Sequence, residues 1–482
     1  MEDQETPQEG LYQKRIPIFT RSVKGKFRTF KSVVMYVAYL VYFVLPWVPW
    51  NRTGAANQAV LFDLVGRRFF IFNLAIYPQD IFALSLLLFL AAVILFFVTG
   101  LVGRAFCGYF CFQTLWTDAF IFIEQLIQGE RPARLRLYKQ RWNAEKIWKI
   151  VATHLLWLAL AFWTSLTFVL YFGYAPQLVA NFFTGTLVVA GYITVIALTT
   201  ATYLAAGWLR EQVCMYMCPY ARFQSVMYEP ETLVVTYETA RGEGEKGRVA
   251  ARQGLRTREE RQEQGHGDCI DCGLCVQVCP AGIDIRKGLQ FPCISCGLCI
   301  DACNGIMDSM GYPRGLIRYD SEVNMKSRRP GSPHLYWLSI KTIGYGSFIL
   351  LMGAYLVYDL STRTEFEESV QQIRQPIFVT LSDGEIRNRY QIRVTNKTDH
   401  DQDYVISTSG IPTQAVEYDS GSNEMKVRSG KSLMVQASVK LSPELAEKTE
   451  HFEFIIAPKD KPGEASKRKM RFYSEHESEH ED

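Results

Sequence analysis

The sequence has few histidines and lacks the motif by which haem is attached covalently to a protein. No Cys-x-x-Cys-His occurs anywhere in the 482 residues. Only one of the seven histidines, His154, lies well inside a long apolar run, so the chain lacks the paired histidines that a membrane b-type haem needs. We interpret His154 as a packed or hydrogen-bonded residue, with a functional role as the less favoured alternative. Haem proteins are therefore disfavoured.

Apolar residues are concentrated in long runs. The hydrophobic fraction of 48% is ordinary for a soluble protein. A helix that crosses a bilayer, however, needs about 20 predominantly apolar residues in succession. Five runs have roughly this length, so the sequence predicts an α-helical polytopic membrane protein with five spans. These runs lie near residues 33–50, 80–102, 147–172, 184–209 and 335–358.

Basic residues predict the orientation of the spans, because Lys and Arg are enriched in cytoplasmic loops. The segments "KRIPIFTRSVKGKFRTFK", "ERPARLRLYKQR" and the one containing Lys326, Arg328 and Arg329 share one side if the N-terminus is cytoplasmic. Arg67 and Arg68 oppose this orientation, because their loop then falls on the outer side. All twelve cysteines fall on the inner side or at inner ends of spans, where thiols stay reduced.

The chain divides into segments of different character. After the fifth run, short alternating stretches between residues 375 and 460 are separated by turn residues, which predicts an immunoglobulin-like β-sandwich. The final "EHESEHED" is interpreted as a solvated end, with metal binding by His476 and His480 as a weaker alternative. The predicted domains are a cytoplasmic N-terminal segment (1–32), a four-helix membrane domain (33–209), a cytoplasmic insertion (210–334), a fifth span (335–358) and an outer β-domain with an acidic tail (359–482).

Eight cysteines in the insertion occur in two runs, "CIDCGLCVQVCP" and "CISCGLCIDAC". The spacing Cys-x2-Cys-x2-Cys-x3-Cys is that of bacterial ferredoxins, in which the fourth thiolate of each run binds the other run's cluster. The spacing predicts two [4Fe–4S] clusters and thus an electron relay, while two structural zinc sites are the less favoured alternative. The predicted ligands are Cys269, Cys272, Cys275 and Cys303 for one cluster, and Cys293, Cys296, Cys299 and Cys279 for the other.

Four further cysteines lie at the inner ends of predicted spans. Cys-x3-Cys spacing places each pair on one face of a helix, and Pro219 predicts that the second helix ends at the preceding cysteine. Thiolates and the neighbouring thioethers of Met215 and Met217 are soft ligands that suit Cu(I), so the pattern favours a copper or redox site. A reversible disulfide and simple packing are the alternatives. The pairs are Cys107 with Cys111, in "RAFCGYFC", and Cys214 with Cys218, in "REQVCMYMC", an internal repeat.

Four longer stretches carry a resemblance to a known family: "CGYFCFQTLWTDAFIFIEQLI", "REQVCMYMCPYARFQSVM", "CPAGIDIRKGLQFPCISCGLCIDACN" and "GYPRGLIRY". They resemble the FixG/RdxA/CcoG family of cytochrome c oxidase accessory proteins. The resemblance covers the chain through the last span, and the C-terminal region resembles the family's periplasmic domain. The first edge motif departs from the family's Cys-Pro-Gln-Thr, because Phe112 stands in place of the proline. This departure puts the turn after Cys111 in doubt.

The resemblance implies a bacterial inner-membrane protein with two [4Fe–4S] clusters that assists assembly of cbb-type oxidase, with a cupric reductase activity that produces Cu(I). It implies that Cys107, Cys111, Cys214 and Cys218 carry this chemistry and that copper is the substrate or a transient ligand.

Two other functions stay open at this point, a quinol dehydrogenase subunit and a non-catalytic assembly scaffold. The expected partners are membrane lipid, an unidentified cytoplasmic electron donor, and either oxidase subunits or copper transport and chaperone proteins. A nucleic-acid partner is not expected, and a homodimer is left open.

Overall fold

The structure is a computed structural model that describes residues 18–51, 55–77, 80–250, 255, 257–326, 339–362, 364–398 and 400–474. The chain forms two compact units. The first contains residues up to 45, 84–170 and 178–355, and the second contains 46–83, 171–177 and the residues from 356 onward. Arg328, Arg329, His476 and His480 lie outside the described residues, so the predictions that rest on them are not addressed by the structure.

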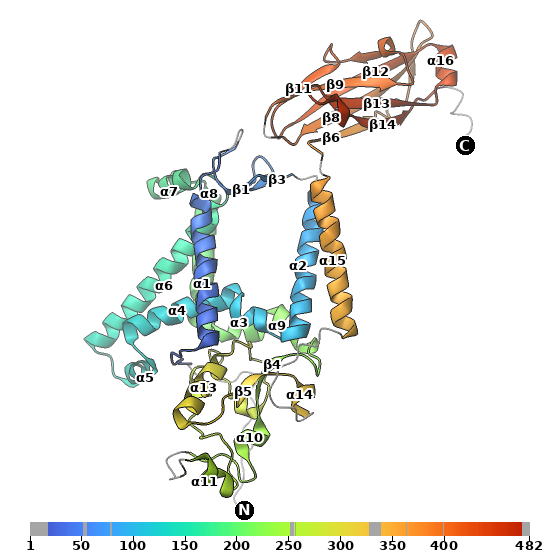
Figure 1. The fold of residues 1–482 in the computed structure, drawn as a ribbon. Coiled ribbons are helices and arrows are strands. Elements are labelled where there is room, and N and C mark those ends of the chain that lie inside the picture. Colours follow the sequence, from blue (N-terminus) through green and yellow to red (C-terminus); the bar gives the residue numbers. More distant parts are fainter. Residues whose placement is uncertain are drawn as a thin grey trace, which may run out of the picture. The chain divides into compact units, whose positions relative to one another are not determined.

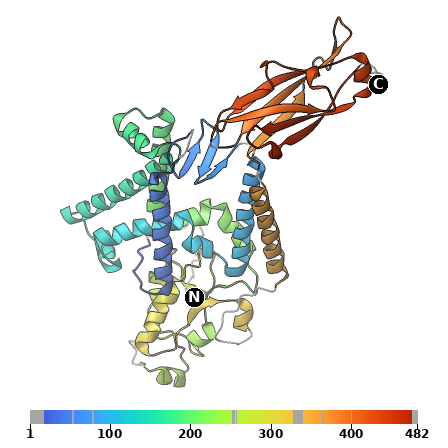
Figure 2. The ribbon, with the colours of Figure 1, turned by 45° about the horizontal axis from the view of Figure 1, so that its top comes forward.

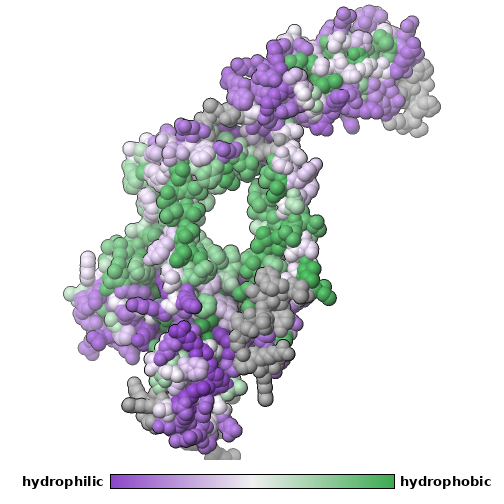
Figure 3. Space-filling view, in the orientation of Figure 1, coloured by the Kyte–Doolittle hydropathy of each residue, from purple (hydrophilic) through white to green (hydrophobic). Residues whose placement is uncertain are grey.

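Long apolar helices dominate the first unit. Within the described ranges, six helices are long and apolar enough to cross a membrane, and their exposed faces form the apolar surface in Figure 3. Five of them overlap the predicted spans. The sixth, Ala105–Gln128, was not predicted; half of its most apolar window is buried. The helices of this part are α1 (Lys26–Val44), α2 (Ile81–Val102), α3 (Ala105–Tyr109), α4 (Phe112–Gln128), α5 (Arg131–Lys139), α6 (Ala144–Leu170), α7 (Ala175–Thr184), α8 (Val189–Thr202) with a π-helical end (Tyr203–Leu209), and α15 (Ile340–Ser361).

The unpredicted helix α4 runs across α1 in two views of the molecule (Figures 1 and 2). It carries one face of buried residues, including Leu115, Trp116 and Phe120, and packs them against Met35 of α1 and Trp157 of α6. The indole of Trp116 donates a hydrogen bond to Thr164 Oγ1 at 2.9 Å. Because α4 is polar on its other face, its pattern is that of an amphipathic helix rather than of a uniformly apolar span.

A small cysteine-rich module completes the first unit. Its two-stranded antiparallel sheet pairs β4 (Val234–Tyr237) with β5 (Ile317–Asp320). The helices α12 and α13 each begin after a glycine in the left-handed backbone conformation, Gly273 (φ 66°) and Gly297 (φ 70°). Glycine adopts this conformation without steric cost, which lets each cysteine run turn tightly into its helix. The helices of the module are α9 (Pro219–Val226), α10 (Thr239–Glu243), α11 (Arg258–Glu263), α12 (Leu274–Gln277), α13 (Leu298–Met310) and α14 (Glu322–Lys326).

The second unit contains the predicted immunoglobulin-like sandwich. One sheet has the order β10-β12-β8-β6, with β7 beside β8, and the other has the order β11-β9-β13-β14. Alternate side chains of each strand point into the core, as Phe452, Phe454 and Ile456 do on β13. The strands are β6 (Phe366–Gln372), β7 (Val379–Thr380), β8 (Ile386–Asn396), β9 (Gln402–Ser409), β10 (Val416–Tyr418), β11 (Glu424–Val427), β12 (Ser432–Leu441), β13 (His451–Pro458) and β14 (Ser466–Arg471), with helix α16 (Pro443–Lys448). The sandwich therefore extends beyond the predicted 375–460.

The same unit contains a three-stranded antiparallel sheet that was not predicted. It consists of β1 (Val60–Asp63), β2 (Arg68–Ile71) and β3 (Leu74–Ile76). The turn between the first two strands contains Arg67 with a φ of 53°, in the sequence "GRRFF". The loop that opposed the predicted orientation is thus a folded hairpin, in which Arg68 pairs with Asp63.

Candidate functional site

The first group of thiols lies at the end of the module that contains α12. Cys303, on α13, is an electrostatic neighbour of Cys269, Cys272 and Cys275. Cys272 is exposed, whereas Cys269 and Cys275 are buried. The structure thus brings the fourth thiol of the second run beside the first three thiols of the first run. We call these four residues the outer lobe.

The second group of thiols lies nearer the membrane helices. Cys279 has Cys296 and Cys293 as its electrostatic neighbours, and Cys299 has all three of these thiols nearby. The fourth thiol of the first run therefore joins the first three of the second run. We call Cys279, Cys293, Cys296 and Cys299 the inner lobe. Cys275 of the outer lobe is also a neighbour of Cys299, so the two lobes adjoin.

The raised pKa values of these thiols indicate that the lobes need a metal cation to hold thiolates. Burial raises the pKa of Cys275 and Cys293 to about 11, and that of Cys279 and Cys303 to about 12; nearby thiols add to the effect. Thiols with such pKa values stay protonated at neutral pH, and thiolates become favourable only when a cation replaces the proton. Metal coordination supplies that cation.

The donor sets fit iron–sulfur clusters better than single ions. A structural zinc ion needs four ligands around one point. In a cubane each thiolate binds a different iron, so the sulfur atoms surround a larger object. Two groups of four thiols, with left-handed glycines at their turns, suit that arrangement. The assignment of each thiol as an iron ligand stays a prediction from spacing.

The four edge cysteines come together from the two repeats. Cys107 has Cys111 and Cys214 as electrostatic neighbours, and Cys214 has Cys111 and Cys218. Burial, followed by the charge of neighbouring thiols, raises the pKa of Cys214 to about 11. We call these four residues the edge group. The structure therefore places the two predicted pairs beside each other, while their chemical role stays a prediction.

The backbone at the edge group differs in part from the predicted helix. Cys107 lies on α3, but Cys111 falls after α3 ends and has an extended backbone (φ −67°, ψ 131°) before Phe112 begins α4. The turn therefore forms without the family's proline. Cys214 lies on a π-helical turn, Val213–Met217, and Cys218 is extended before Pro219 begins α9. The predicted helix end at Cys218 is confirmed.

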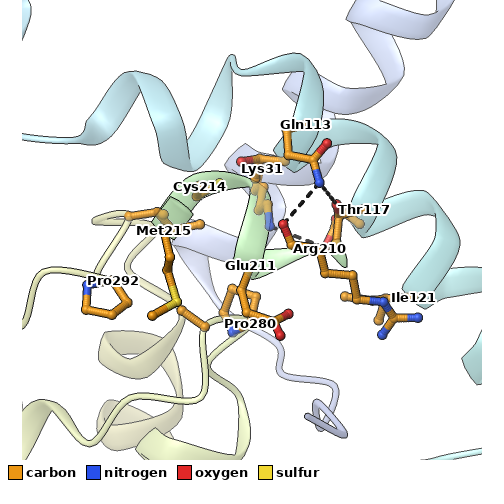
Figure 4. Close-up of a pocket in the computed structure, with 14 residues that line it drawn as sticks. Lys31, Gln113, Thr117, Ile121, Arg210, Glu211, Cys214, Met215, Pro280 and Pro292 are labelled. Atoms are coloured by element: carbon orange, nitrogen blue, oxygen red, sulfur yellow. Dashed lines mark hydrogen bonds and ion pairs between the residues drawn. The ribbon is translucent and has the colours of Figure 1, made fainter. Parts of the chain in front are cut away.

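A pocket lies between the edge group and the inner lobe (Figure 4). Cys214 and Met215 line one wall, while Pro280 and Pro292, each adjacent in sequence to an inner-lobe cysteine, line another. Met215 points toward these prolines in Figure 4. The side chain of Met217 is exposed and does not line the pocket.

The first edge motif rests directly on the backbone of the inner lobe. A Cβ atom on Gly108 would lie 2.7 Å from the carbonyl oxygen of Ile294 and 3.1 Å from the Cα of Cys296. The hydroxyl of Tyr109 donates a hydrogen bond to the carbonyl of Cys296 at 2.8 Å. Real Cβ atoms do not approach backbone this closely, so only glycine permits the contact. This contact explains the glycine and the tyrosine of "CGYFC".

Arg104 links the same motif to two other segments. Its buried guanidinium donates hydrogen bonds to the carbonyls of Phe291 and Ala221 and lies 4.5 Å from the ring centroid of Phe291. Phe291 is two residues before Cys293, and Ala221 is three residues after Cys218. One side chain therefore fixes the inner lobe and both edge motifs relative to each other. Sequence reasoning noted this arginine in the repeat without a role for it.

The second repeat arginine holds the turn that precedes Cys214. Arg210 has a φ of 44°, and its guanidinium pairs with Glu124, which also pairs with the buried Arg134. The side-chain amide of Gln113 donates to the carbonyls of Ala205 and Arg210, at 2.7 and 3.2 Å. A largely enclosed carboxylate between two guanidiniums is a rigid support, because breaking the pair leaves an uncompensated charge. This network was not predicted.

His154 lies apart from these sites. Its Nδ1 is 3.0 Å from the hydroxyl of Tyr203, and its ring packs near Trp157 and Trp208. These contacts agree with the interpretation of a packed, hydrogen-bonded histidine.

One glycine pattern in the module has the spacing of a dinucleotide-binding loop: Gly242, Gly244 and Gly247. Such a loop joins a strand directly to the start of a helix. Here Gly242 lies within α10, and a Cβ on it would lie 2.1 Å from the hydroxyl of Tyr237. Gly244 forms a bridge with His266. Close packing therefore accounts for Gly242 and Gly244, and a φ of 82° accounts for Gly247. The three glycines lie within and after α10, not in the turn between β4 and α10 where a dinucleotide-binding loop would lie.

Three family profiles match separate parts of the chain. Residues 209–322 match a family described as a 4Fe-4S dicluster domain, and residues 83–127 match a 4Fe-4S binding domain. Residues 356–475 match the immunoglobulin-like fold at the C-terminus of FixG.

Curated relatives match most of the chain. Protein RdxB of Cereibacter sphaeroides is 41% identical over 414 residues, which cover 85% of each chain. Protein RdxA of the same organism is 41% identical over 407 residues, covering 83% of this chain and 84% of RdxA. Nitrogen fixation protein FixG of Rhizobium meliloti is 37% identical over 432 residues, covering 83% and 81%. A crystal structure of a FixG-related protein from Vibrio parahaemolyticus aligns with 23% identity, 23% coverage of this chain, 99% coverage of that chain and a TM-score of 0.20.

Proposed function

The chain belongs to the family of FixG, RdxA and RdxB, with a membrane part, iron–sulfur domains and an immunoglobulin-like domain, and from this premise we propose that it is a cupric reductase. In this proposal electrons enter at the outer lobe, pass to the inner lobe and reach Cu(II) at the edge group. The product, Cu(I), serves assembly of a cbb-type cytochrome oxidase.

The contact between the first edge motif and the inner lobe carries this proposal. Gly108 and Tyr109 lie between Cys107 and Cys111 and touch the backbone of Ile294 and Cys296. The lobes adjoin through Cys275 and Cys299. The thiols of the two lobes thus form a series that begins at the exposed Cys272. The step from the inner lobe to the edge group crosses the contact that Gly108 and Tyr109 make with the inner-lobe backbone.

In this proposal each group of residues has a role that follows from its chemistry. When bound, a [4Fe–4S] cluster supplies one-electron transfer with little rearrangement of its ligands. The eight lobe cysteines hold such clusters, and Gly108, Tyr109 and Arg104 fix their distance to the edge group. Met215 and Met217 provide thioethers, which favour Cu(I) over Cu(II), so the ion is retained most strongly after it has gained its electron.

The membrane arrangement that we propose has five spans, a cytoplasmic module and a periplasmic β-sandwich in a bacterial inner membrane. The crossing of α4 over α1 supports five spans rather than six, because helices that cross the same bilayer run roughly along one another. The electron donor is then a cytoplasmic one-electron carrier, and Cys272 marks where it docks.

A copper titration tests the proposal. Purified, anaerobically reduced protein is mixed with Cu(II), and Cu(I) is measured with a colorimetric chelator. We expect one Cu(I) for each electron stored, and a fall of more than about tenfold in rate when all four edge cysteines become serine. Met434→Leu, a change at an exposed methionine of β12, is the matched control. An unchanged rate in the serine variant contradicts the proposal.

A second measurement separates the two rival functions. Oxidation of the clusters by Cu(II) with no response to menaquinol supports a cupric reductase, whereas reduction of the clusters by menaquinol in copper-free protein indicates a quinol dehydrogenase. If cluster-ligand variants accumulate normally and still support oxidase assembly, the protein is a scaffold.

A further inference from the structure

The outward face of strand β8 in the sandwich carries a row of arginines. Side chains along a strand alternate between the two faces of a sheet, and Arg387, Arg389 and Arg393 all lie on the face that points away from the core. The residues between them on the other face, such as Tyr390 and Ile392, are fully buried. Since β8 lies between β12 on one side and β6 and β7 on the other, these arginines stand within a sheet face and not at its edge. We call the three residues the arginine row.

The neighbouring strands place no acidic side chain directly opposite the arginine row. The cross-strand partners are Lys440, Ser438 and Met434 on β12, for Arg387, Arg389 and Arg393 in that order, together with Val379 on β7 and Ser369 on β6. Arg387 and Lys440 are like charges in opposite positions, which is unfavourable in a sheet. The face therefore has an excess of positive charge along its middle.

The acidic residues at the border of this face are paired with lysines. Glu417 of β10 pairs with Lys440 at 2.7 Å, and Glu367 of β6 pairs with Lys397 at 3.1 Å. Over the described ranges of the chain, no guanidinium of the arginine row forms an ion pair. The Nε of Arg387 is buried and has no hydrogen-bond partner within the same ranges. A buried donor without an acceptor is costly, so the row favours an anionic partner that is not among the described residues.

The described part of the chain ends beside the strand that carries this row. The Nδ2 of Asn388 donates a hydrogen bond to the carbonyl of Tyr473 at 2.9 Å, and the amide of Tyr473 donates to Asn388 Oδ1 at 3.3 Å. Asn388 lies between Arg387 and Arg389 in the sequence of β8. Phe472 is buried in the core of the sandwich, so the chain is held in place up to this point. The last eight residues of the protein therefore begin close to the arginine row.

These eight residues, 475–482, are complementary to the arginine row in charge and in spacing. We call them the acidic tail. Their sequence, "EHESEHED", has a glutamate at every second position from 475 to 481. In an extended chain alternate side chains lie on one side, about 7 Å apart, which is also the spacing of Arg387 and Arg389.

The acidic tail is also long enough to cover the row. Eight extended residues reach about 26–29 Å. The row from Arg387 to Arg393 covers six residue steps of a strand, about 20 Å. The match to the immunoglobulin-like domain of FixG ends at residue 475, so nearly all of the tail is an addition to that domain.

We propose that the acidic tail lies extended along the arginine row, with its glutamates paired to Arg387, Arg389 and Arg393. One exposed ion pair contributes little, but a short tether gives the whole segment a high effective concentration at the row. The face is thus a binding site for an extended acidic peptide, which the chain itself occupies, and another acidic partner has to displace the tail. This differs from the interpretation of these residues as a solvated end. The inference goes beyond the proposed function and does not depend on it.

Binding of a free peptide tests the proposal. A fluorescent peptide with the sequence of residues 475–482 is titrated, at low ionic strength in a neutral detergent, with the intact protein and with a chain that ends at Ser474. We expect fluorescence anisotropy to show binding to the shortened chain and binding at least about tenfold weaker to the intact protein, whose own tail competes. Added salt should weaken the binding, because it screens the charges. A peptide with glutamine in place of its four glutamates is the control and should not bind.

The arginines are tested in the shortened chain. The triple variant Arg387→Gln/Arg389→Gln/Arg393→Gln should bind the peptide about tenfold more weakly, since three ion pairs are lost. The single variant Arg389→Gln covers the case in which the triple variant does not accumulate, and should weaken binding about twofold to threefold. The matched control removes three exposed charges from the outer face of the other sheet and should leave binding nearly unchanged; it is Lys426→Gln/Lys467→Gln/Lys469→Gln.

Three results would overturn the proposal. Equal binding of the peptide to the intact and the shortened chain would show that the tail does not occupy the face. An equal loss of binding in the arginine and lysine triple variants would show attraction to net charge alone. Absence of binding to the shortened chain would leave the arginine row to an anionic partner of another kind, such as a lipid surface.

Discussion

The two lobes of the module have nearly the same sequence but different surroundings. Gly273 and Gly297 occupy equivalent positions in the two cysteine runs, with φ values of 66° and 70°. A Cβ on Gly273 would meet only Gln277 Nε2, at 3.9 Å, whereas a Cβ on Gly297 would lie 2.7 Å from the ring of Phe27. The motif therefore sets the backbone of both lobes. The membrane helices decide which lobe is enclosed.

Helix α1 makes much of this difference. The backbone amide of Arg28 donates a hydrogen bond at 2.8 Å to the carboxylate of Asp301. Asp301 lies on α13 between Cys299 of the inner lobe and Cys303 of the outer lobe. The carboxylate thus lies at the N-terminus of α1, where it faces the unpaired amides and the positive end of the helix dipole, which is favourable. The inner lobe is thus covered by α1 and by the first edge motif. The outer lobe keeps an exposed thiol, Cys272.

The largest expected effect tests access to the two lobes. Cys272→Ala and Cys296→Ala are each expected to lose up to about four irons, because a cluster with three thiolates is unstable. Added 2-mercaptoethanol should restore iron to Cys272→Ala, since Cys272 is exposed, but not to Cys296→Ala, since Cys296 is 8% exposed. Iron and sulfide analysis before and after reconstitution measures this. Equal rescue of both variants would show that the lobes are equally open.

The next effect compares the equivalent glycines. Gly273→Ala should lower the free energy of unfolding by about 1–2 kcal/mol, the cost of a left-handed alanine. Gly297→Ala carries the same cost and also collides with Phe27, which adds about 1–3 kcal/mol of overpacking. Denaturant unfolding in detergent gives the difference between the two. If the two variants are equally stable, α1 does not press on the inner lobe.

A smaller effect is expected at the contact between the edge motif and the inner lobe. Gly108→Ala should destabilise the protein by about 1–3 kcal/mol, because the new methyl group meets backbone atoms that cannot rotate away. Cupric reduction should fall as the two segments separate, with the iron content retained.

The control for this change is Gly305→Ala on α13, where a Cβ meets nothing within 4 Å. Alanine is the better helix former there, so a gain of up to about 1 kcal/mol is expected. Equal rates of copper reduction in the two variants would contradict a role for the Gly108 contact.

The smallest expected effect is that of one hydrogen bond. Tyr109→Phe removes the donor to the Cys296 carbonyl and should cost about 0.5–1.5 kcal/mol. The potential of the inner-lobe cluster should shift, while that of the outer lobe stays the same. The exposed Tyr216→Phe should change neither quantity. Redox titration followed by electron paramagnetic resonance checks both variants. A shift in the potential of the outer-lobe cluster alone would contradict the expected effect of the Tyr109 hydrogen bond.

The sequence predicted those parts of the molecule whose signals are local. The Cys-x2-Cys-x2-Cys-x3-Cys spacing grouped the eight lobe cysteines as the structure does, because the crossing of ligands follows from a fixed run of residues. The alternation of apolar and polar residues that predicted the strands of the sandwich is likewise contained within each short segment. The proline at 219 located the end of the turn at Cys218.

The parts that the sequence did not predict depend on contacts between distant segments. Helix α4 has one polar face that holds Gln113 and Asp118, so it does not read as a span, and its burial is visible only when α1 and α6 are in place. The hydrogen bond from Tyr109 to Cys296 joins residues 187 positions apart. No periodicity within a single segment indicates such a pairing.

Helix α13 carries one thiol for each lobe, Cys299 and Cys303, one turn apart. Their separation along the axis is about 6 Å and is set by the rise of an α-helix, which hardly stretches under thermal motion. In the relay proposed above, the spacing of these two ligands is therefore fixed by the helix. Under that proposal, regulation would act at the two ends, on the electron donor and on the acceptor.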